Sequence, residues 1–549
     1  MNDLDFQADY VARQAWRLCA MQDANPASPS YGCFHYAYWR DKTSEFADAR
    51  FQEAGPTLAL LSLPAFDSLR ATAGAPSSEV LRDRFRAALR SWEAQQYPEG
   101  CWDEWYKGER GFAATHFTTV AFGLVAWLAP EILDSEDRAI MERVMCRAGN
   151  WLLPRHDRIK SNHEAAAAAA LTLIHHVTGD ERFSTGARGK VDDFLARRTR
   201  QNWYPELGAL DLGYCFVSLD YLMLYELISG DATAREAMGA LFAFCAPHIH
   251  PDFTVASEAG VCLNPYLGRL GAGLLSPQNS AAAGLVEALE TRSAGFAGLA
   301  PYLADDLRIC RWSYLPLVTH LLRHRFRRDL QSTGAFWPDG WTLRAPSGIV
   351  AGHVGTWHVY FSAAGGGTVH LFSGDRPVAV DHGLVIRAQN ARLTASGYNS
   401  ARALRQIDDG FETQIILVPA VFFFPSFTQR LVLRLFSLTP WGARFIRALI
   451  DRVRIAKKSA VNQSSAPVAG GNGDCKLSRS VQIRDGMLIL RDRLESRTPL
   501  APGSILLNAT AGGKPVATPD FGPAPIRTLT IEKSFGPGGD VAIAVTHTA

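Results

Sequence analysis

Ser161-Asn162-His163-Glu164, running directly into the six alanines Ala165 to Ala170, is the stretch that decides how this sequence folds. Ser161 and Glu164 have the spacing of a capping box, in which each side chain satisfies a free backbone N–H of the first helical turn. The alanines let a neighbouring helix approach closely. The stretch therefore predicts a tightly packed helix with an asparagine and a histidine at its mouth. The simpler of two interpretations is structural, with His163 a partly buried, hydrogen-bonded histidine.

Length, composition and charge indicate how many domains the chain forms and which partners it lacks. The chain has 549 residues, of which 47% are hydrophobic and 20% charged, so it is globular and too long for one ordinary core. Two large domains, or a repeat domain and a second domain, are therefore expected. A formal net charge of only +2 gives no general attraction for nucleic acid, and we predict no nucleic-acid partner.

The cysteines and the distribution of apolar residues indicate the cellular compartment. The nine cysteines are odd in number and form no CxxC pair, which is typical of reduced, mostly buried thiols and not of a disulfide framework or a zinc site. The first residues lack a basic region followed by an apolar one, so we expect no secretory signal and a cytoplasmic location. No apolar run reaches the roughly 18 to 20 residues of a spanning helix, so no transmembrane segment is predicted.

Residues 1–325 follow a helical pattern, with apolar residues at three-to-four spacing. Two of the helices end in similar turns, whose glycines, Gly179 and Gly230, are 51 residues apart. That is about the length of one helical hairpin, and repeated hairpins of that length are typical of an (α/α) toroid or a solenoid. The clearest predicted helices are 6–21, 55–72, 78–96, 113–128, 136–153, 162–178, 181–198, 213–228 and 233–246.

Two loops between these helices are dense in aromatic and acidic residues. A sugar-binding cleft needs both kinds, since pyranose rings present apolar faces to aromatic side chains and hydroxyls to carboxylates. The alternative is that the aromatic residues simply pack between helices. The first loop contributes the candidate substrate-binding residues Trp102, Asp103, Glu104, Tyr106 and Arg110, and the second contributes Trp203 and Tyr204.

The second loop also carries the candidate catalytic residues Glu206 and Asp211, and it leads to Tyr214. Tyr214 follows His163 by 51 residues, the hairpin length found for the glycine turns. Two positions one hairpin apart fall at the same end of neighbouring toroid units, so His163 and Tyr214 are expected to face one cleft. The alternative is that Tyr214 is a core residue at a helix start.

From residue 326 onward the pattern changes to short alternating or β-branched runs between Gly and Asp turns, as in the strands of a β-sandwich. The clearest runs are 355–362, 368–372, 378–380, 414–418, 480–483 and 487–490. The predicted fold is therefore an α+β multidomain protein, with an N-terminal (α/α) toroid over 1–325 and a C-terminal antiparallel β-sandwich over 326–549.

Residues 428–458, within the second domain, are both basic and apolar, with Trp441 near the middle. If the second half is helical, apolar residues such as Phe445 and Leu449 share one face and arginines spread around the others. Such a segment suits peripheral contact with an anionic membrane or an anionic glycan, so membrane association is a second expectation for location. The alternative is an insertion packed on the sandwich with solvated arginines. Residues 459–474 are predicted to form a flexible loop.

Asn162-His163 at a helix start, with an acidic, glycine-containing loop ending in Tyr214 one hairpin later, resembles the heparinase II/III and alginate-lyase-like superfamily. The segment 368–383 also resembles strands of that superfamily's sandwich. The resemblance covers nearly the whole chain. It implies a toroid followed by a sandwich, and β-elimination at a uronic acid of an anionic polysaccharide or oligosaccharide.

β-Elimination requires a group that neutralises the carboxylate, a base for the C5 proton and an acid for the leaving oxygen. The resemblance implies that Asn162 and His163 contact the carboxylate or share the role of base, and that Tyr214 is the acid or the base. A tyrosine, with an ordinary pKa of about 10, acts as a base only if neighbouring cations or donors lower that pKa. Arg110 or Arg269 would supply such a field. No cofactor is expected, and no metal-ligand spacing stands out.

One departure from the superfamily pattern bears on the chemistry. Active members carry a His-rich, Asp-containing loop where this sequence reads Ser362 to Gly367, so His353, His358 or His370 would have to replace the missing histidine. Two further functions therefore stay open: a glycoside hydrolase that uses a carboxylate pair, and a glycan-binding protein without catalysis. The candidate carboxylates are Asp103, Glu104, Glu206 and Asp211.

Overall fold

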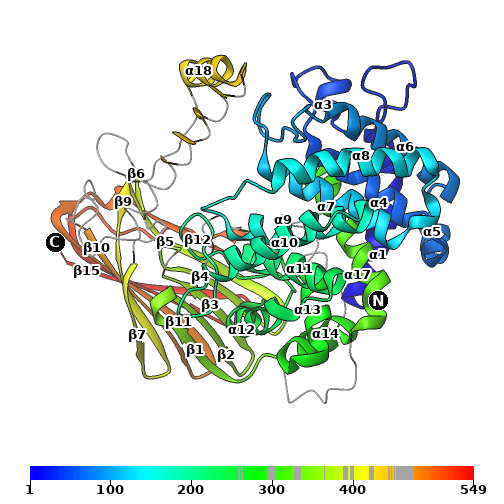
Figure 1. Cartoon of the computed structure of the whole chain (residues 1–549). Helices are drawn as coiled ribbons and strands as arrows, with labels where there is room; N and C mark the ends of the chain where they lie inside the picture. The colour runs from blue at the N-terminus through cyan, green and yellow to red at the C-terminus, as the bar shows by residue number, and fades with distance from the viewer. Residues whose placement is uncertain are drawn as a thin grey trace.

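The computed structural model has helices in its N-terminal part and antiparallel strands in its C-terminal part (Figure 1). A helical domain followed by a sandwich is therefore confirmed. Among the described residues, η9 (Arg323–Arg325) is the last helical turn before strand β1 (Gly340–Arg344), and the predicted boundary at 325 stays a prediction. The structure describes residues 1–257, 260, 262, 264–292, 305–326, 336–363, 365–387, 393–395, 401–419, 426–439, 441–442, 445–446, 448–449, 452 and 475–548.

The inner helices of the first domain make contacts in a closed circuit. Each helix packs on the next one, and the last packs on the first. In order they are α4 (Ala54–Leu61), α7 (Phe112–Leu128), α9 (Ser161–Thr178), α11 (Leu212–Ser229), α13 (Arg269–Leu275) and α17 (Tyr314–Leu322).

The outer helices bury only one face. In α6 the buried residues include Leu81, Phe85, Leu89 and Trp92, which recur at three- and four-residue spacing. Outer helices pack on the inner ones as follows: α6 (Ser78–Gln95) on α4, α8 (Ser135–Leu152) on α7 and α9, α10 (Glu181–Leu195) on α9, α12 (Arg235–Cys245) on α11 and α13, α14 (Ser280–Thr291) on α13, and α1 (Asp3–Arg13) on α17. Shorter helices are α2 (Ala15–Met21), α3 (Tyr36–Trp39), α5 (Asp67–Ala73) and α16 (Asp306–Trp312).

Helix α9 is buried on all sides over its first turns. The alanines Ala165 to Ala170 are fully buried, and helices α7, α8, α10 and α11 all contact α9. On α7, a Cβ added to Gly123 would lie 2.9 Å from the Cβ of Leu173, closer than two such carbons ordinarily approach. Small side chains on both helices therefore allow the close approach that the alanine run predicts.

The predicted capping box at Ser161 is wrong. Lys160 is the N-cap of α9, and its side chain makes no capping hydrogen bond. Ser161 Oγ instead donates to Pro205 O at 2.7 Å, and Glu164 Oε1 accepts from Asp157 N at 2.5 Å. Both side chains thus hold neighbouring loops against the start of α9, because those loops offer better-placed partners than the first-turn amides.

Two predicted helices are interrupted. The helix predicted over 55–72 forms as α4 and α5, since Pro64 lacks a backbone N–H and begins a separate 3₁₀ turn. The helix predicted over 6–21 forms as α1 and α2. Between them, the Gln14 amide is shared by the carbonyls of Tyr10 and Val11, a tightened turn of the 3₁₀ kind.

The sandwich consists of two antiparallel sheets. One runs in the order β1, β2 (Ile349–Val354), β3 (Trp357–Ser362), β4 (Thr368–Ser373), β5 (Arg376–Arg387), β12 (Ile505–Ala511) and β13 (Lys514–Pro515), with β6 (Leu393–Ala395) on β5 and β9 (Val418–Pro419) on β6. The other runs in the order β15 (Val541–Thr548), β14 (Ile526–Phe535), β11 (Met487–Leu500), β10 (Cys475–Arg484), β8 (Gly410–Ile416) and β7 (Ala401–Ile407). Along β11 buried residues alternate with less buried ones, as one core-facing side requires.

A fully buried group of four charges joins the two sheets. Arg479 of β10 binds Asp492 of β11 (Nε–Oδ1 2.7 Å) and Asp381 of β5 (Nη2–Oδ1 2.6 Å). Lys533 of β14 completes the group, with its Nζ 2.9 Å from Asp492 Oδ2 and also paired with Asp381. Because two cations face two carboxylates, the charges balance inside the apolar core.

Several sequence expectations concern single features. All nine cysteines lie in the described part and form no disulfide there, and seven of them are buried, as expected for reduced thiols. Helix α11 is long and apolar enough to cross a membrane, but 78% of it is buried inside the protein, the position of a core helix.

Within 428–458 the structure describes α18 (Phe427–Ser437) and a few residues after it, and the predicted loop 459–474 lies outside the described residues.

Candidate active site

Two loops meet at the mouth of α9 and α11. Lys160 forms an antiparallel bridge with Glu206, and Leu207 N donates to Ile159 O at 2.6 Å. This pairing holds the loop before α9 against the loop before α11. The side chains of Asn162 and Glu206 are thereby brought together. The predicted common cleft of His163 and Tyr214 stays a prediction.

Glu206 is buried with one oxygen held and one without a partner. Its Oε2 accepts a hydrogen bond from Asn162 Nδ2 at 2.6 Å. Its Oε1, like Asn162 Oδ1, has no hydrogen-bond partner among the residues that the structure describes. Burial raises the pKa of Glu206 to about 8, against the opposing charge of Lys160. Glu206 therefore keeps its proton at neutral pH.

Glu104 lies between two arginines. Its Oε1 is 3.0 Å from Arg311 Nη1 and 3.9 Å from Arg50 Nη1, while its buried Oε2 has no hydrogen-bond partner in the described part of the chain. The arginines are held in turn, Arg50 by Glu53 and Arg311 by Asp48. Burial disfavours the Glu104 carboxylate, but the charges of Arg311 and Arg50 outweigh burial and lower its pKa. Glu104 is therefore ionised at neutral pH.

The two carboxyl groups share one electrostatic environment. The charge of Lys160 lowers the pKa of both, and both raise the pKa of Tyr214. One carboxyl is protonated and the other ionised at the same pH, which is the division that acid–base catalysis requires.

His163 forms a dyad with Asp157. Its Nδ1 lies 2.8 Å from Asp157 Oδ2, and both residues are largely buried. Burial disfavours the Asp157 carboxylate, but the charge and hydrogen bond of His163 outweigh it and hold the pKa of Asp157 well below its ordinary value. The buried His116 ring lies 5.0 Å from the His163 ring, and burial keeps the pKa of His116 well below its ordinary value. An imidazole oriented by a carboxylate in this way is suited to accept a proton.

Asp211 and Tyr214 sit at the start of α11. Asp211 is the N-cap, and its oxygens accept from Tyr214 N at 3.1 Å and from Cys262 N at 2.8 Å. Gly213 is required between them, because an added Cβ would lie 2.0 Å from Asn264 O. Asp211 therefore positions the chain around Tyr214 rather than offering a free carboxylate.

The expectation that Arg110 or Arg269 lowers the pKa of Tyr214 is wrong. Arg110 lies over the Tyr97 ring at 4.4 Å and 3.4 Å from Glu99, and Arg269 pairs with Asp3 at 2.5 Å. Burial first, and then the charge of Glu206, raise the pKa of Tyr214 instead of lowering it. Tyr214 is therefore a phenol at neutral pH and can serve as an acid but not as a ready base.

Several residues predicted to bind sugar instead pack inside the protein or hold a loop in place. Trp102 is fully buried and stacks on Trp92 with ring centroids 4.8 Å apart, and Tyr204 is buried and stacks on Phe194 at 4.0 Å. Asp103 organises its own loop by accepting from Tyr97 Oη at 2.6 Å and from two backbone amides. Trp203 is partly buried against the core.

A cavity of about 520 Å³ lies between the 97–110 loop and α18. Trp105 lines this cavity, and its ring lies 5.5 Å from the guanidinium of Arg311, which binds Glu104. The cavity is lined by the aromatic residues Phe46, Tyr97, Trp105 and Tyr106, and by the charged residues Lys107, Arg110, Arg430, Arg434 and Glu45. This lining matches the predicted roles of Tyr106 and Arg110 better than that of Trp102.

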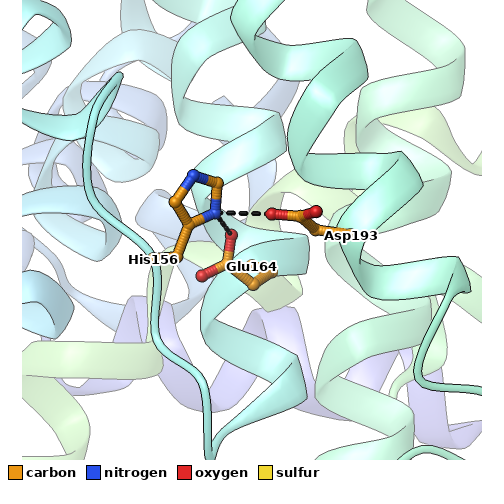
Figure 2. A group of neighbouring side chains, drawn as sticks. All are labelled: His156, Glu164 and Asp193. Atoms are coloured by element: carbon orange, nitrogen blue, oxygen red, sulfur yellow. Dashed lines mark hydrogen bonds and ion pairs between the residues drawn. The ribbon is translucent and has the colours of Figure 1, made fainter.

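His156, Glu164 and Asp193 form a cluster at the outer side of α9 that has the composition of a metal site (Figure 2). His156 Nδ1 lies 2.6 Å from Asp193 Oδ2 and 3.3 Å from Glu164 Oε2. However, the Lys190 ammonium lies 3.5 Å from Glu164 Oε2 and 3.3 Å from His156 Nδ1. A cation of the protein itself therefore neutralises this cluster, and a metal ion would have to displace it.

The histidines proposed to replace the missing sandwich loop lie on neighbouring strands. His353 Nδ1 is 2.8 Å from His358 Nδ1, and the His370 ring packs edge-on against His250 of the helical domain at 4.8 Å. Burial lowers the pKa of both His353 and His358 to about 4, so both are neutral at pH 7. Their catalytic role stays a prediction.

Sequence reasoning missed Arg50, Glu53, Arg311 and Asp157. A signal existed for Arg311, a charged residue within the apolar run Ile309-Cys310-Arg311-Trp312, since such a residue is buried only with a partner. The others precede helices in ordinary polar surroundings. Nothing in the sequence around them indicates which interior they face.

The comparisons with known proteins define no family. No family model matches the chain, and no curated protein matches it. Among solved structures, a GH127 β-arabinofuranosidase aligns over 100% of this chain and 92% of its own length, with a TM-score of 0.35 and 7% identity. A superposition this loose carries no argument about activity.

Proposed function

We propose that this protein is a carbohydrate-active enzyme that hydrolyses a glycosidic bond of an anionic glycan. The observation that carries the proposal is that two buried glutamates, Glu206 and Glu104, both interact electrostatically with Lys160 and Tyr214 and have pKa values displaced in opposite directions. Each carboxyl also has one oxygen held in place and one buried oxygen without a partner among the described residues. Glycoside hydrolysis needs two carboxyl groups, one that donates a proton and one that is ionised.

The helical domain is interpreted as the predicted (α/α) toroid. The closed circuit of inner helices supports this, and α7, α9 and α11 all begin close to the site. The N-terminal ends of helices carry partial positive charge and favour anions. Together with Arg50, Arg311 and Lys160, they make the mouth of the domain suitable for an anionic sugar.

The two carboxyl groups take different roles. Glu206, protonated, donates its proton to the leaving glycosidic oxygen. Glu104, ionised and fixed by Arg311, either activates the attacking water or attacks the anomeric carbon itself. The cavity beside Trp105 would hold a further sugar unit, whose ring stacks on the aromatic side chains and whose acidic group meets Lys107 and Arg110.

Proton donation by Glu206 predicts how kcat/KM depends on pH. Because Glu206 must be protonated and its pKa is about 8, kcat/KM should fall as the pH rises through about 8. At the acidic side, activity should persist below the ordinary pKa of a glutamate, since the pKa of Glu104 is lowered. A pH–rate profile on the purified protein measures both limbs, and a rate that rises with pH above 8 would contradict the assignment.

A second candidate is β-elimination at a uronic acid, which the sequence resemblance implies. The His163–Asp157 dyad next to Asn162 favours it, since an oriented imidazole could remove the C5 proton. Tyr214, whose pKa is raised, would then protonate the leaving oxygen. Without the superfamily's sandwich loop, we place this candidate second.

Tyr214→Phe separates the two candidates. Hydrolysis by the glutamate pair should lose less than about tenfold in kcat, because the phenol is not the proton donor. Elimination should lose roughly 10²–10⁴-fold, the usual contribution of an acid or base. Tyr225→Phe is a matched control, since Tyr225 bonds Asp231 at the other end of α11 from Tyr214 and its loss should leave both activities unchanged.

The proposal is tested by incubating the protein with alginate, polygalacturonate and hyaluronan and following two signals. New reducing ends without the ultraviolet absorbance of an unsaturated uronic acid would support hydrolysis. New reducing ends accompanied by that absorbance would establish elimination. If the protein binds one of these polymers but cleaves none of them, it is a glycan-binding protein without catalysis.

A further inference from the structure

Helix α18 presents its apolar side chains to the solvent. Phe427, Leu431 and Leu435 recur every four residues, so they share one face, and they are 80%, 44% and 57% exposed. The opposite face carries Leu433 and Ser437, which line the cavity beside the 97–110 loop. An ordinary surface helix turns its apolar face inward. Here that face points away from the protein.

The exposed apolar surface continues beyond the helix. Leu438 is 78% and Trp441 72% exposed, and the Trp441 ring stacks on Phe445 with centroids 6.0 Å apart. In Figure 1, α18 stands apart from the two sheets of the sandwich. A surface of this kind in a water-soluble chain is a mark of an interaction site.

The charge of the segment indicates the partner. Residues 428–458 contain eight Lys or Arg residues and one Asp, a net charge of +7, whereas the whole chain carries only +2. Arg430 and Arg434 lie on α18 beside its apolar face and are exposed. An apolar face bordered by arginines suits the boundary between headgroups and acyl chains of an anionic membrane, where the arginines meet lipid phosphates.

We propose that α18 docks this protein on a membrane surface that contains anionic lipids, with Phe427, Leu431 and Leu435 inserted among the acyl chains. The helix lies in the plane of the interface and does not span it, since its 11 residues are too few to cross a bilayer. Insertion of these three side chains is independent of the glycan chemistry, because they do not line the cavity, whereas Arg430 and Arg434 do.

The test is flotation with vesicles. The full-length protein should float with vesicles of phosphatidylcholine and phosphatidylglycerol in equal parts, and much less with phosphatidylcholine alone. The variant F427S/L431S/L435S should lose roughly tenfold or more in vesicle affinity, since three apolar side chains no longer enter the membrane. Val80→Ser, which removes another exposed apolar residue on α6, should bind as the wild type does.

A second readout follows Trp441. Its fluorescence should shift to the blue when anionic vesicles are added, and that shift should be absent from W441F. Because the altered residues are exposed, the thermal midpoint of each variant should match that of the wild type. Wild-type protein that stays with the unbound fraction in both vesicle preparations would overturn the proposal. So would a wild type that dimerises through this face, with a monomeric triple variant and no vesicle binding in either.

Discussion

Glu206→Gln should lower kcat/KM on a natural glycan by roughly 10²–10⁴-fold, the contribution expected of a general acid. Glutamine has the size of glutamate and can still accept the hydrogen bond from Asn162, so the site should keep its shape. What is lost is the proton that the buried environment retains up to a pH of about 8. The kinetic comparison is made on whichever uronic-acid polymer the wild type cleaves.

The leaving group provides an internal check on this assignment. An aryl glycoside with a nitrophenolate leaving group needs little protonation, so the loss caused by Glu206→Gln should shrink strongly on that substrate. Glu226→Gln is the matched control, since Glu226 lies at the other end of α11 and pairs with Arg235. If Glu206→Gln is as active as the wild type, or if the loss is equal on both substrates, Glu206 is not the acid.

Arg479→Met should destabilise the sandwich by about 3–5 kcal/mol, the usual cost of removing one partner from a buried ion pair. The loss leaves Asp381 and Asp492 fully buried with only Lys533 to balance them. Two carboxylates that share one cation in an apolar core cannot both stay ionised cheaply. Urea unfolding followed by circular dichroism measures the change.

Arg491→Met is the matched control for this prediction. Arg491 stands next to Asp492 on the same strand, but its pair with Glu532 is exposed, so the expected cost is about 0–1 kcal/mol. Equal destabilisation by the two variants would contradict the role assigned to the buried group.

The same group predicts how stability depends on pH. Burial disfavours the Asp381 carboxylate, but the charges of Arg479 and Lys533 outweigh it and lower its pKa to about 2. A carboxyl group whose pKa is lower in the folded state contributes stability above its unfolded pKa and loses it as the pH falls through the folded pKa. The contribution of Asp381 should therefore disappear between about pH 4 and pH 2 in the wild type.

The sequence predicted the order of helices and strands better than the roles of single residues. Helical and strand periodicity reflects which face is buried, so the order of helices and strands could be read directly. The spacing of 51 residues between His163 and Tyr214 predicted that these side chains face one cleft, and that stays a prediction. The contact between Asn162 and Glu206 was not predicted.

Side-chain partners were harder to predict. Aromatic residues beside carboxylates suit a sugar, but Trp102 and Tyr204 found equally good stacking partners in Trp92 and Phe194. The spacing of Ser161 and Glu164 permits a capping box, yet partners distant in the sequence took both side chains. Arg50 could not be identified from the sequence as a residue of the site, because only tertiary packing brings it near Glu104.

Cleavage of a glycosidic bond by addition of water, with Glu206 and Glu104 as the acting residues, can be followed by carrying out the reaction in ¹⁸O-labelled water and measuring the products by mass spectrometry. Hydrolysis places one labelled oxygen in one of the two fragments of each bond cleaved. Elimination forms a carbon–carbon double bond and incorporates no solvent oxygen when the bond breaks. We predict labelled, saturated products from the wild type and none from Glu206→Gln. Unlabelled fragments that end in an unsaturated uronic acid would contradict the account.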